Sequence, residues 1–259
     1  MTAPTQNGPS SFDDFPILVI SLSDAKDRQS KIEKDLSSYG LPFEFHTAVD
    51  GRKGLDETYN ALVDRPKLYH NANRQVADGE IACALSHHEI YTRIVTENLA
   101  GAIILEDDAI IGDDFADFVA KGLHRDFEAV IMDYRRASVL RWSKTPVTDT
   151  VDLWRMAQSS TLTTGYSISN WAARILLQET TPVKMLADWP IDVHRIKAYA
   201  SAPRLIDHPE DEVSFIEQER AKMLPAQRPK KQRFRHILKA HYWRNKIAKR
   251  IDPPRHSAS

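Results

Sequence analysis

Cysteine is almost absent from this sequence of 259 residues, in which Cys83 is the single one. One thiol excludes an internal disulfide and fits a reducing compartment. The sequence also lacks any run near the ~18 apolar residues of a membrane-spanning helix. Residues 1–11 are small and polar and hold no apolar segment typical of a signal peptide, so a disordered leader is expected over residues 1–14. These absences predict a cytoplasmic protein.

Internal repeats, a nucleophilic Cys/His pair and nucleic-acid-binding motifs are missing as well, so no nucleic-acid partner is expected. What is present is an uneven distribution of charge. Residues 225–259 hold eleven Lys/Arg and one Asp, a net charge of +10, so the other 224 residues carry −11 to give the total of −1. A basic end on an acidic body indicates an anionic partner.

The basic end also has a helical pattern. Residues 228–250 interleave cationic residues with apolar ones at spacings of three, four and seven: Phe234, Ile237, Leu238, Tyr242, Trp243 and Ile247. The pattern predicts a basic amphipathic tail over residues 223–259 that lies on an anionic membrane surface. A solvated or partner-docking helix is the alternative.

The remainder reads as alternating strands and helices. Apolar runs predict strands at residues 15–22, 43–49, 103–105, 129–133, 161–168 and 204–206. Helical spacing predicts helices at residues 25–39, 78–98 and 171–179, after residue 114, and near residues 193–199. The first helix is expected to begin at an N-cap of Ser23-Asp24 and to end at Gly40. Residues 52–78 predict a loop-rich insertion with a short helix, whereas the pattern of residues 137–160 does not favour any one element.

The strand at residues 103–105 runs directly into Glu106, Asp107 and Asp108. Its continuous apolar run predicts a strand buried on both faces, and its acids would lie at the sheet edge where open α/β folds bind ligands. Adjacent carboxylates repel one another, so a cation is favoured. Oxygen ligands suit Mg²⁺ or Mn²⁺, which often bridge a carboxylate to a substrate phosphate. A solvated turn after an edge strand is the alternative.

A series of short patches in a fixed order resembles glycosyltransferase family 25, the lipooligosaccharide galactosyltransferase type. The patches are residues 17–22 with Asp27-Arg28, residues 41–45 with 48–51, and residues 79–87, 105–109, 164–169 and 190–192. They span roughly residues 16–216, which predicts a catalytic domain over residues 15–222. Ser21 departs from the pattern, since the family usually has Asn there. The resemblance implies a GT-A type α/β fold with a Rossmann-like, mostly parallel central sheet flanked by helices.

The resemblance also implies roles at the acidic motif. Asp108 is assigned as the direct ligand of Mn²⁺ or Mg²⁺. Glu106 is expected to face the ribose or sugar and is a second candidate ligand, whereas Asp107 either supports the metal or points away by strand alternation. His208 is a candidate to complete the metal shell, with an ordinary loop histidine as the alternative.

Nucleotide contacts are expected from the first strand and helix. The resemblance assigns the backbone of Ile20, Ser21 and Leu22 to the uracil. The guanidinium of Arg28 suits a uridine carbonyl or a phosphate. The alternative for Arg28 is a surface arginine paired with Asp24 or Asp27.

The long helix at residues 78–98 carries a second set of candidates. Glu80 and His87 are seven residues apart, so about two helical turns place them on one face, next to Ser86. One interpretation is recognition of the donor sugar or its diphosphate. The other is a buried histidine that ties this helix to the sheet.

The general base should be a carboxylate near the acceptor. Asp192 is the first choice because it follows Pro190 in a matched patch and adjoins Trp189, which could stack on a sugar ring. Asp188 is its rival, and an N-cap for the following helix is the alternative role of Asp192.

These assignments predict an inverting, metal-dependent glycosyltransferase that moves a hexose, galactose from UDP-galactose as the first choice, onto a lipopolysaccharide or lipooligosaccharide glycan. UDP-glucose and UDP-N-acetylglucosamine are alternative donors. A catalytically silent nucleotide- or glycan-binding protein is the alternative of a different class. A lipid-linked acceptor would place the protein at the inner leaflet of the bacterial inner membrane.

Overall fold

A large sheet runs through the part of the chain that the computed structural model describes, residues 14–209, 244 and 246–251. Its strands are β1 (Ile17–Ser21), β2 (Glu44–Thr47), β3 (Gly101–Glu106), β5 (Ala129–Ile131), β6 (Ala137–Pro146), β7 (Asp152–Met156), β8 (Gly165–Ser169), β9 (Ala198–Ala202) and β11 (Ala248–Ile251). They lie in the order β11-β6-β7-β9-β5-β8-β3-β1-β2. A separate antiparallel pair joins β4 (Ile110–Ile111) to β10 (Ile206–Asp207).

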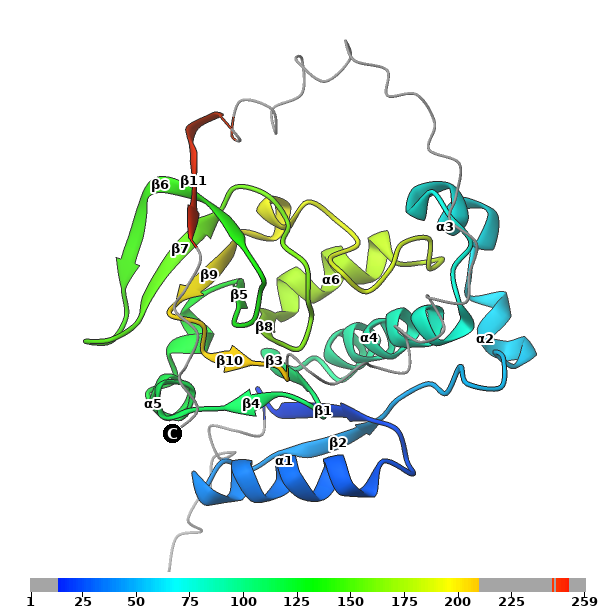
Figure 1. Ribbon diagram of the computed structural model, residues 1–259, viewed down its shortest axis with the longest axis horizontal. Helices are drawn as coiled ribbons and strands as arrows, with labels where there is room; N and C mark the ends of the chain where they lie inside the picture. Colours follow the sequence, from blue (N-terminus) through cyan, green and yellow to red (C-terminus); the bar gives the residue numbers. More distant parts are fainter. Residues whose placement is uncertain (1–13, 210–243, 245, 252–259) are drawn as a thin grey trace, which may run out of the picture.

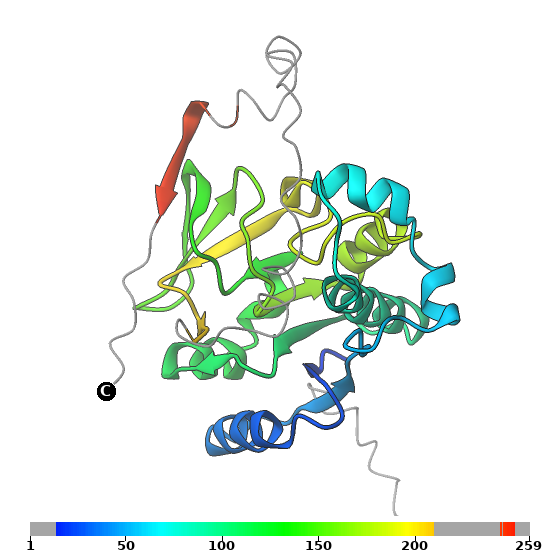
Figure 2. The same ribbon diagram turned by 45° about the vertical axis from the view of Figure 1, so that its right-hand side comes forward.

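Helices cover both faces of the sheet (Figures 1 and 2). They are α1 (Lys26–Ser38), α2 (Glu57–Ala61), α3 (Arg65–Ala72), α4 (Asp78–Thr96), α5 (Asp113–Ala120) and α6 (Asn170–Glu179), with single 3₁₀ turns η1 (Leu123–Asp126) and η2 (Val193–Ile196). Strand alternation divides the core. Leu18 and Ile104 pack with α4 and α6, whereas Val19 and Leu105 pack with α1 and α5.

The predicted β-α-β unit is present, because β1 pairs in parallel with both β2 and β3. Gly40 lies just beyond α1 with a φ of +65°, as predicted for a glycine at a helix end. The predicted cap at Ser23-Asp24 is wrong. Helix α1 begins after Ala25, which makes no side-chain cap but closes a turn by donating its N–H to the carbonyl of Leu22.

The GT-A-like α/β fold is confirmed, but the sheet is mixed rather than mostly parallel. Strand β8 runs antiparallel between β3 and β5, and β6, β7 and β11 continue antiparallel beyond β9. The parallel pairs of the described sheet are β1–β2, β1–β3 and β5–β9. An apolar run fixes burial and not strand direction, so the sequence could not distinguish these arrangements.

Two segments carry more structure than expected. Residues 52–78 contain two helices instead of one, and each begins at an aspartate: Asp56 accepts from the N–H of Tyr59, and Asp64 accepts from that of Lys67. Residues 137–160, for which no element was predicted, contain the β6–β7 hairpin.

The helix predicted near residues 193–199 is wrong beyond its first turn. The turn η2 ends at Lys197, which has a left-handed φ of +51°, and Tyr199 already belongs to strand β9. Pairing of β9 with β5 and β7 satisfies backbone groups that a continued helix would have bonded internally.

Of the predicted tail, the structure describes residues 244 and 246–251. Ala248–Ile251 form strand β11 against β6, so the amphipathic-helix prediction is wrong for these four residues. The ammonium of Lys249 lies 3.3 Å from the centroid of the Trp154 ring, which favours this pairing. Residues 223–243 and the expected leader at residues 1–13 lie outside the described residues.

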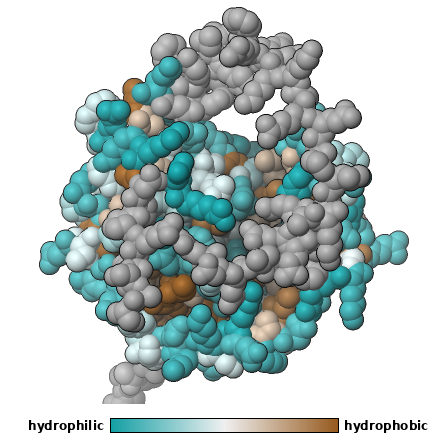
Figure 3. Space-filling model, in the orientation of Figure 1, coloured by the Kyte–Doolittle hydropathy of each residue, from teal (hydrophilic) through white to brown (hydrophobic). Residues whose placement is uncertain are grey.

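The described surface is mostly hydrophilic on the face shown in Figure 3, with hydrophobic residues in small groups. Within the described ranges, every helix is too short or too polar to cross a bilayer.

Candidate functional site at the carboxyl end of strand β3

The acidic motif begins at the last residue of a strand that is buried on both faces, as predicted. Strand β3 lies between β1 and β8, and the N–H of Glu106 donates to the carbonyl of Thr164 at 2.9 Å. Alternation then directs successive acids apart: Glu106 faces α4, and Asp107 faces the turn between β1 and α1.

Asp107 joins the motif to the first β-α turn. Its Oδ2 accepts from the hydroxyl of Ser21 at 2.7 Å, and its Oδ1 accepts from Nη1 of Arg28 at 3.2 Å. Gln29 donates to the Ser21 hydroxyl and to the carbonyl of Leu22. Arg28 therefore pairs with Asp107. Gln29 was missed by sequence reasoning, and its position beside Arg28 was the available signal.

Some of the backbone groups that the resemblance assigns to uracil already accept hydrogen bonds from within the protein. The carbonyl of Ser21 accepts from the N–H of Ala48, and that of Leu22 accepts from Ala25 as well as from Gln29. Ile20 lies within the β1 ladder opposite Glu106. A contact of this backbone with a base remains a prediction.

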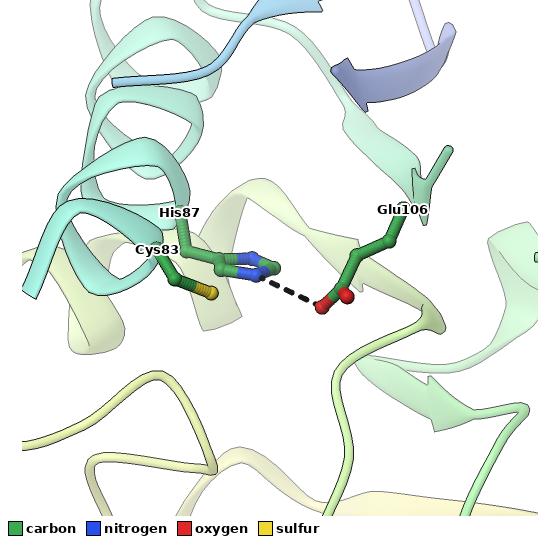
Figure 4. Close-up of side chains that lie close together, drawn as sticks. All are labelled: Cys83, His87 and Glu106. Atoms are coloured by element: carbon green, nitrogen blue, oxygen red, sulfur yellow. Dashed lines mark ion pairs between the residues drawn. The ribbon is translucent and has the colours of Figure 1, made fainter. Parts of the chain in front are cut away.

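Glu106 lies among polar side chains from α4 and from the loop before β8 (Figure 4). Its Oε1 lies 3.6 Å from Nε2 of His87 and accepts from the hydroxyl of Thr163 at 2.9 Å. Burial acts to raise the pKa of Glu106, but His87 and Thr163 outweigh it and hold that pKa below its ordinary value. Glu106 is therefore a carboxylate at neutral pH.

His87 also ties α4 to the sheet. It is 2% exposed, and its Nδ1 lies 2.7 Å from the hydroxyl of Tyr166 on β8. Tyr166 in turn donates to the hydroxyl of Tyr91 at 3.2 Å. The proposed structural role of this histidine is thus observed, while its second nitrogen faces the acidic motif.

Asp108 has a buried carboxylate oxygen, Oδ1, with no hydrogen-bond partner among the described residues. Burial and the negative charge of Glu106 raise the pKa of Asp108 to about 6. A buried oxygen that lacks a donor, next to a second carboxylate, fits a ligand of a hard divalent cation. The residues at this position therefore fit the predicted Mn²⁺ or Mg²⁺.

Glu80 and Ser86 have internal partners instead. Both oxygens of Glu80 accept from the guanidinium of Arg74, and Oε2 also accepts from the N–H of Ala77 at the start of α4. The hydroxyl of Ser86 accepts from the N–H of Val49 and is fully buried. Both side chains thus have structural roles at α4, and their contact with a donor sugar remains a prediction.

The two candidate bases occupy different environments. Asp192 accepts from the N–H of His194 at the start of η2, and its other oxygen pairs with Arg244, so the N-cap alternative is the one observed. Asp188 is exposed and accepts from the N–H of Leu162 at 3.2 Å, next to the Thr163 that contacts the acidic motif. Its charge is among those that raise the pKa of Cys83. Asp188 is thus linked to Glu106 through Leu162 and Thr163, whereas the contacts of Asp192 join it to η2 and Arg244.

Trp189 is 3% exposed, which is incompatible with stacking on a sugar ring. Its indole N–H donates to the carbonyl of Leu162, and its ring packs edge-on against Tyr166 at a centroid distance of 5.1 Å. It supports the loop that carries Asp188.

His208 lies in a second group of charged side chains, here called the arginine cluster: Asp133, Arg204, Asp207 and His208. Arg204 forms ion pairs with Asp133 at 3.5 Å and with Asp207. Nδ1 of His208 lies 2.9 Å from Oδ2 of Asp133, and this contact raises the pKa of His208. Asp133 is fully buried and was missed by sequence reasoning, because a single acid after an apolar run gives no distinct signal.

The arginine cluster lies alongside the acidic motif in the backbone pairing. Asp207 is opposite Ile110 in the antiparallel β4–β10 ladder. His208, the next residue, therefore lies near the residues just after Asp108. Gly165 permits this approach, since a Cβ there would lie 2.8 Å from the side chain of Ile206. Whether His208 completes the shell around Asp108 remains a prediction.

A mixed sheet in which β3, the parallel neighbour of β1, ends at an acidic motif, with helices on both faces, is consistent with a GT-A-like glycosyltransferase fold. The chain belongs to glycosyltransferase family 25: residues 15–193 match the family described as Glycosyltransferase family 25 (LPS biosynthesis protein). The resemblance given by the sequence patches is thereby confirmed.

Curated relatives carry related names. The lipooligosaccharide biosynthesis protein lic2B of Haemophilus influenzae is 33% identical over 103 residues, which cover 40% of this chain and 37% of that protein. Procollagen galactosyltransferase 1-A of Xenopus laevis is 30% identical over 194 residues, 70% of this chain and 30% of the relative. A glycosyltransferase 25 family member of Aedes aegypti is 27% identical over 184 residues, 68% and 28% respectively. The chain thus matches less than two fifths of the length of these relatives.

Proposed function

We propose that this protein transfers a hexose from a UDP-sugar, galactose as the first choice, onto a lipopolysaccharide- or lipooligosaccharide-type glycan with inversion at the anomeric carbon. The observation that carries the proposal is the buried, unpartnered oxygen of Asp108 at the end of β3, beside the Asp107–Arg28 pair. Membership of family 25 supports transfer chemistry, and the printed names of the relatives favour a galactosyl donor and a lipooligosaccharide acceptor. UDP-glucose and UDP-N-acetylglucosamine are the alternative donors.

Asp108 and Glu106 would hold Mn²⁺ or Mg²⁺, with His208 as the third ligand. If Nδ1–H of His208 donates its hydrogen bond to Asp133, Nε2 of His208 is left with the lone pair that a metal needs. When bound, the ion would neutralise the diphosphate leaving group as a Lewis acid.

The other steps fall to the side chains around the ion. Asp107 holds the guanidinium of Arg28, which is partly exposed and suited to a phosphate of the donor. Asp188 accepts the proton of the acceptor hydroxyl. The oxygen of that hydroxyl bonds to the anomeric carbon as the bond between this carbon and the diphosphate breaks. We place Asp188 in this role, with Asp192 as its rival, because Asp192 is engaged by Arg244 and by the N–H of His194.

The test is a panel of UDP-sugars with Mn²⁺, assayed with wild type, Asp108→Asn and the matched control Asp117→Asn, an exposed acid on α5. Asp108→Asn is expected to lower kcat/KM roughly a hundredfold or more, a typical effect of losing one charge-stabilising group. Asp117→Asn should match wild type. Equal rates for Asp108→Asn and wild type would remove the metal assignment. For the base, Asp188→Asn should lower kcat far more than Asp192→Asn, and the reverse ranking restores Asp192.

The alternative of a silent binding protein has a distinct outcome in the same assay. Such a protein would bind UDP-sugars but release no UDP with any donor or acceptor glycan. Mn²⁺-dependent release of UDP from one donor of the panel rejects that alternative.

We also propose that the basic end of the chain brings the protein to an anionic membrane surface, where a lipid-linked acceptor is found. The support is the net charge of +10 over residues 225–259. The full-length protein should float with anionic vesicles at low salt and sink with neutral ones. Failure to float with anionic vesicles would reject membrane association and leave the transfer proposal intact.

A further inference from the structure

Three side chains of different chemistry meet where helix α4 faces the end of β3 (Figure 4). Sγ of Cys83, Nε2 of His87 and an oxygen of Glu106 all lie within 4.8 Å of one another. Cys83 and His87 are four residues apart on α4, so one helical turn places them on the same face. The three residues are called the thiol cluster below.

The histidine nitrogen in this cluster has no hydrogen-bond partner among the described residues, although His87 is 2% exposed. Nδ1 of His87 lies 2.7 Å from the hydroxyl of Tyr166, and its Nε2 is directed at the carboxylate of Glu106. Nε2 and Oε1 face each other at 3.6 Å without a hydrogen bond, an arrangement that a cation between them would stabilise.

We propose that the thiol cluster binds a divalent ion of the Zn²⁺ class through Cys83, His87 and Glu106. Sulfur, nitrogen and oxygen ligands lie about 2.0–2.3 Å from Zn²⁺, so neighbouring ligands of a tetrahedral ion are about 3.3–3.7 Å apart. The 3.6 Å separation of Nε2 and Oε1 fits this value, whereas it is too long for a hydrogen bond. Binding replaces the thiol proton of Cys83, which leaves to solvent.

The cluster differs in ligand chemistry from the oxygen site at Asp108. A thiolate and an imidazole select Zn²⁺ or Co²⁺ over Mg²⁺ and Mn²⁺. Cys83 and Glu106 are partly exposed, which leaves a path for the ion and a fourth position for water. Because Glu106 belongs to both sites, an ion in the thiol cluster would withdraw it from the acidic motif. This consequence for transfer rests on the proposed function, whereas binding rests on the cluster alone.

Titration of the full-length protein with Co²⁺ tests the binding. A thiolate ligand gives Co²⁺ a charge-transfer band in the near ultraviolet, and Cys83 is the only cysteine, so the band reports this site. The expected result is a band that saturates at one Co²⁺ per chain and disappears on addition of Zn²⁺. It should be absent in Cys83→Ala, and His87→Gln should weaken Co²⁺ binding at least tenfold. His70→Gln, which changes an exposed histidine on α3 outside both sites, should give the same thiolate band as wild type.

A wild type that binds Co²⁺ without the thiolate band, or a His87→Gln variant of unchanged affinity, would overturn the proposal. It would favour instead a protonated His87 that is ion-paired with Glu106. Cys83→Ala changes one small helical side chain, and a thermal unfolding curve shows whether each variant is folded. If transfer is also observed, Zn²⁺ should inhibit wild type more than Cys83→Ala. Absence of transfer leaves the Co²⁺ result standing, so the two proposals fail separately.

Discussion

The thiol cluster and the arginine cluster both place a histidine beside carboxylates near strand ends, but their charges are balanced differently. In the arginine cluster, Arg204 contacts Asp133 and Asp207 directly, so the chain supplies its own cation. In the thiol cluster, the contacts of Glu106 are a histidine and the hydroxyl of Thr163. A buried carboxylate held by a fixed arginine belongs to the architecture. A carboxylate such as Glu106, which faces a histidine nitrogen without a hydrogen-bond partner in the described part of the chain, can still bind a ligand.

The largest expected effect comes from removing the internal cation. Arg204→Met leaves the fully buried Asp133 without its guanidinium and should lower the free energy of unfolding by about 3–5 kcal/mol, measured by urea denaturation. Arg93→Met removes an arginine paired with exposed Glu44 and Glu97 and serves as the matched control, with a loss below about 1 kcal/mol.

Adding Asp133→Asn to Arg204→Met should recover part of that loss, because the uncompensated charge is then gone. Equal losses for Arg204→Met and Arg93→Met would show that the arginine cluster stabilises the fold no more than a surface ion pair does. The proposed difference between the arginine cluster and the thiol cluster would then be wrong.

A histidine without an acid partner sharpens the comparison. His124 packs edge-on against Phe15, and burial, followed by the nearby charge of Arg125, lowers its pKa to about 4. The unfolded chain, with an ordinary pKa of 6.5, binds the proton first as pH falls. His124 therefore costs stability progressively between pH 6.5 and about 4, on the order of 3 kcal/mol in total. His208 has the opposite sign: Asp133 raises its pKa, so its contribution is lost as pH rises through the folded value.

The measurement is the free energy of unfolding at pH 7 and at pH 4.5 for wild type and His124→Phe. The variant keeps an aromatic ring and should lose less stability over this interval than wild type. An identical loss in both proteins would mean that the buried carboxylates alone set the acid sensitivity.

The smallest expected change in stability concerns the Arg28–Asp107 pair. The side chain of Arg28 is 43% exposed, so Arg28→Met should change the free energy of unfolding by less than about 1 kcal/mol. Under the proposed function it should nevertheless raise KM for the donor about tenfold, through loss of a contact worth about 1.4 kcal/mol. Calorimetric binding of UDP would report this directly. A variant that unfolds easily yet binds UDP normally would place Arg28 with the structural arginines.

Local patterns were sufficient for much of the fold. The apolar runs of β1 and β3, the spacing along α4 and the glycine at residue 40 each constrain only neighbouring residues, and each prediction was confirmed. Strand direction was not predictable, because the run that became β8 is equally apolar in either orientation. The β6–β7 hairpin was missed because its outer part alternates weakly and leaves Trp142 82% exposed.

The site was predicted less completely, because its contacts join distant residues. Ser21 and Asp107 are 86 positions apart, and His87 and Tyr166 are 79 apart, so no local pattern reports either pair. Asp188 and Asp192 lie in one short loop, and both suit a helix cap or a base by composition. The choice between them depends on Leu162, Thr163 and Arg244, which belong to other segments.

The pairing of β11 with β6 has a practical consequence for shortened proteins. A chain cut at the predicted boundary after residue 222 would lose β11 and uncover the edge of β6 at residues 137–140, the part that pairs with β11. Exposed strand edges promote self-association between molecules. The same cut would remove Arg244, the partner of Asp192. Removing the basic end would therefore favour aggregation through the edge of β6.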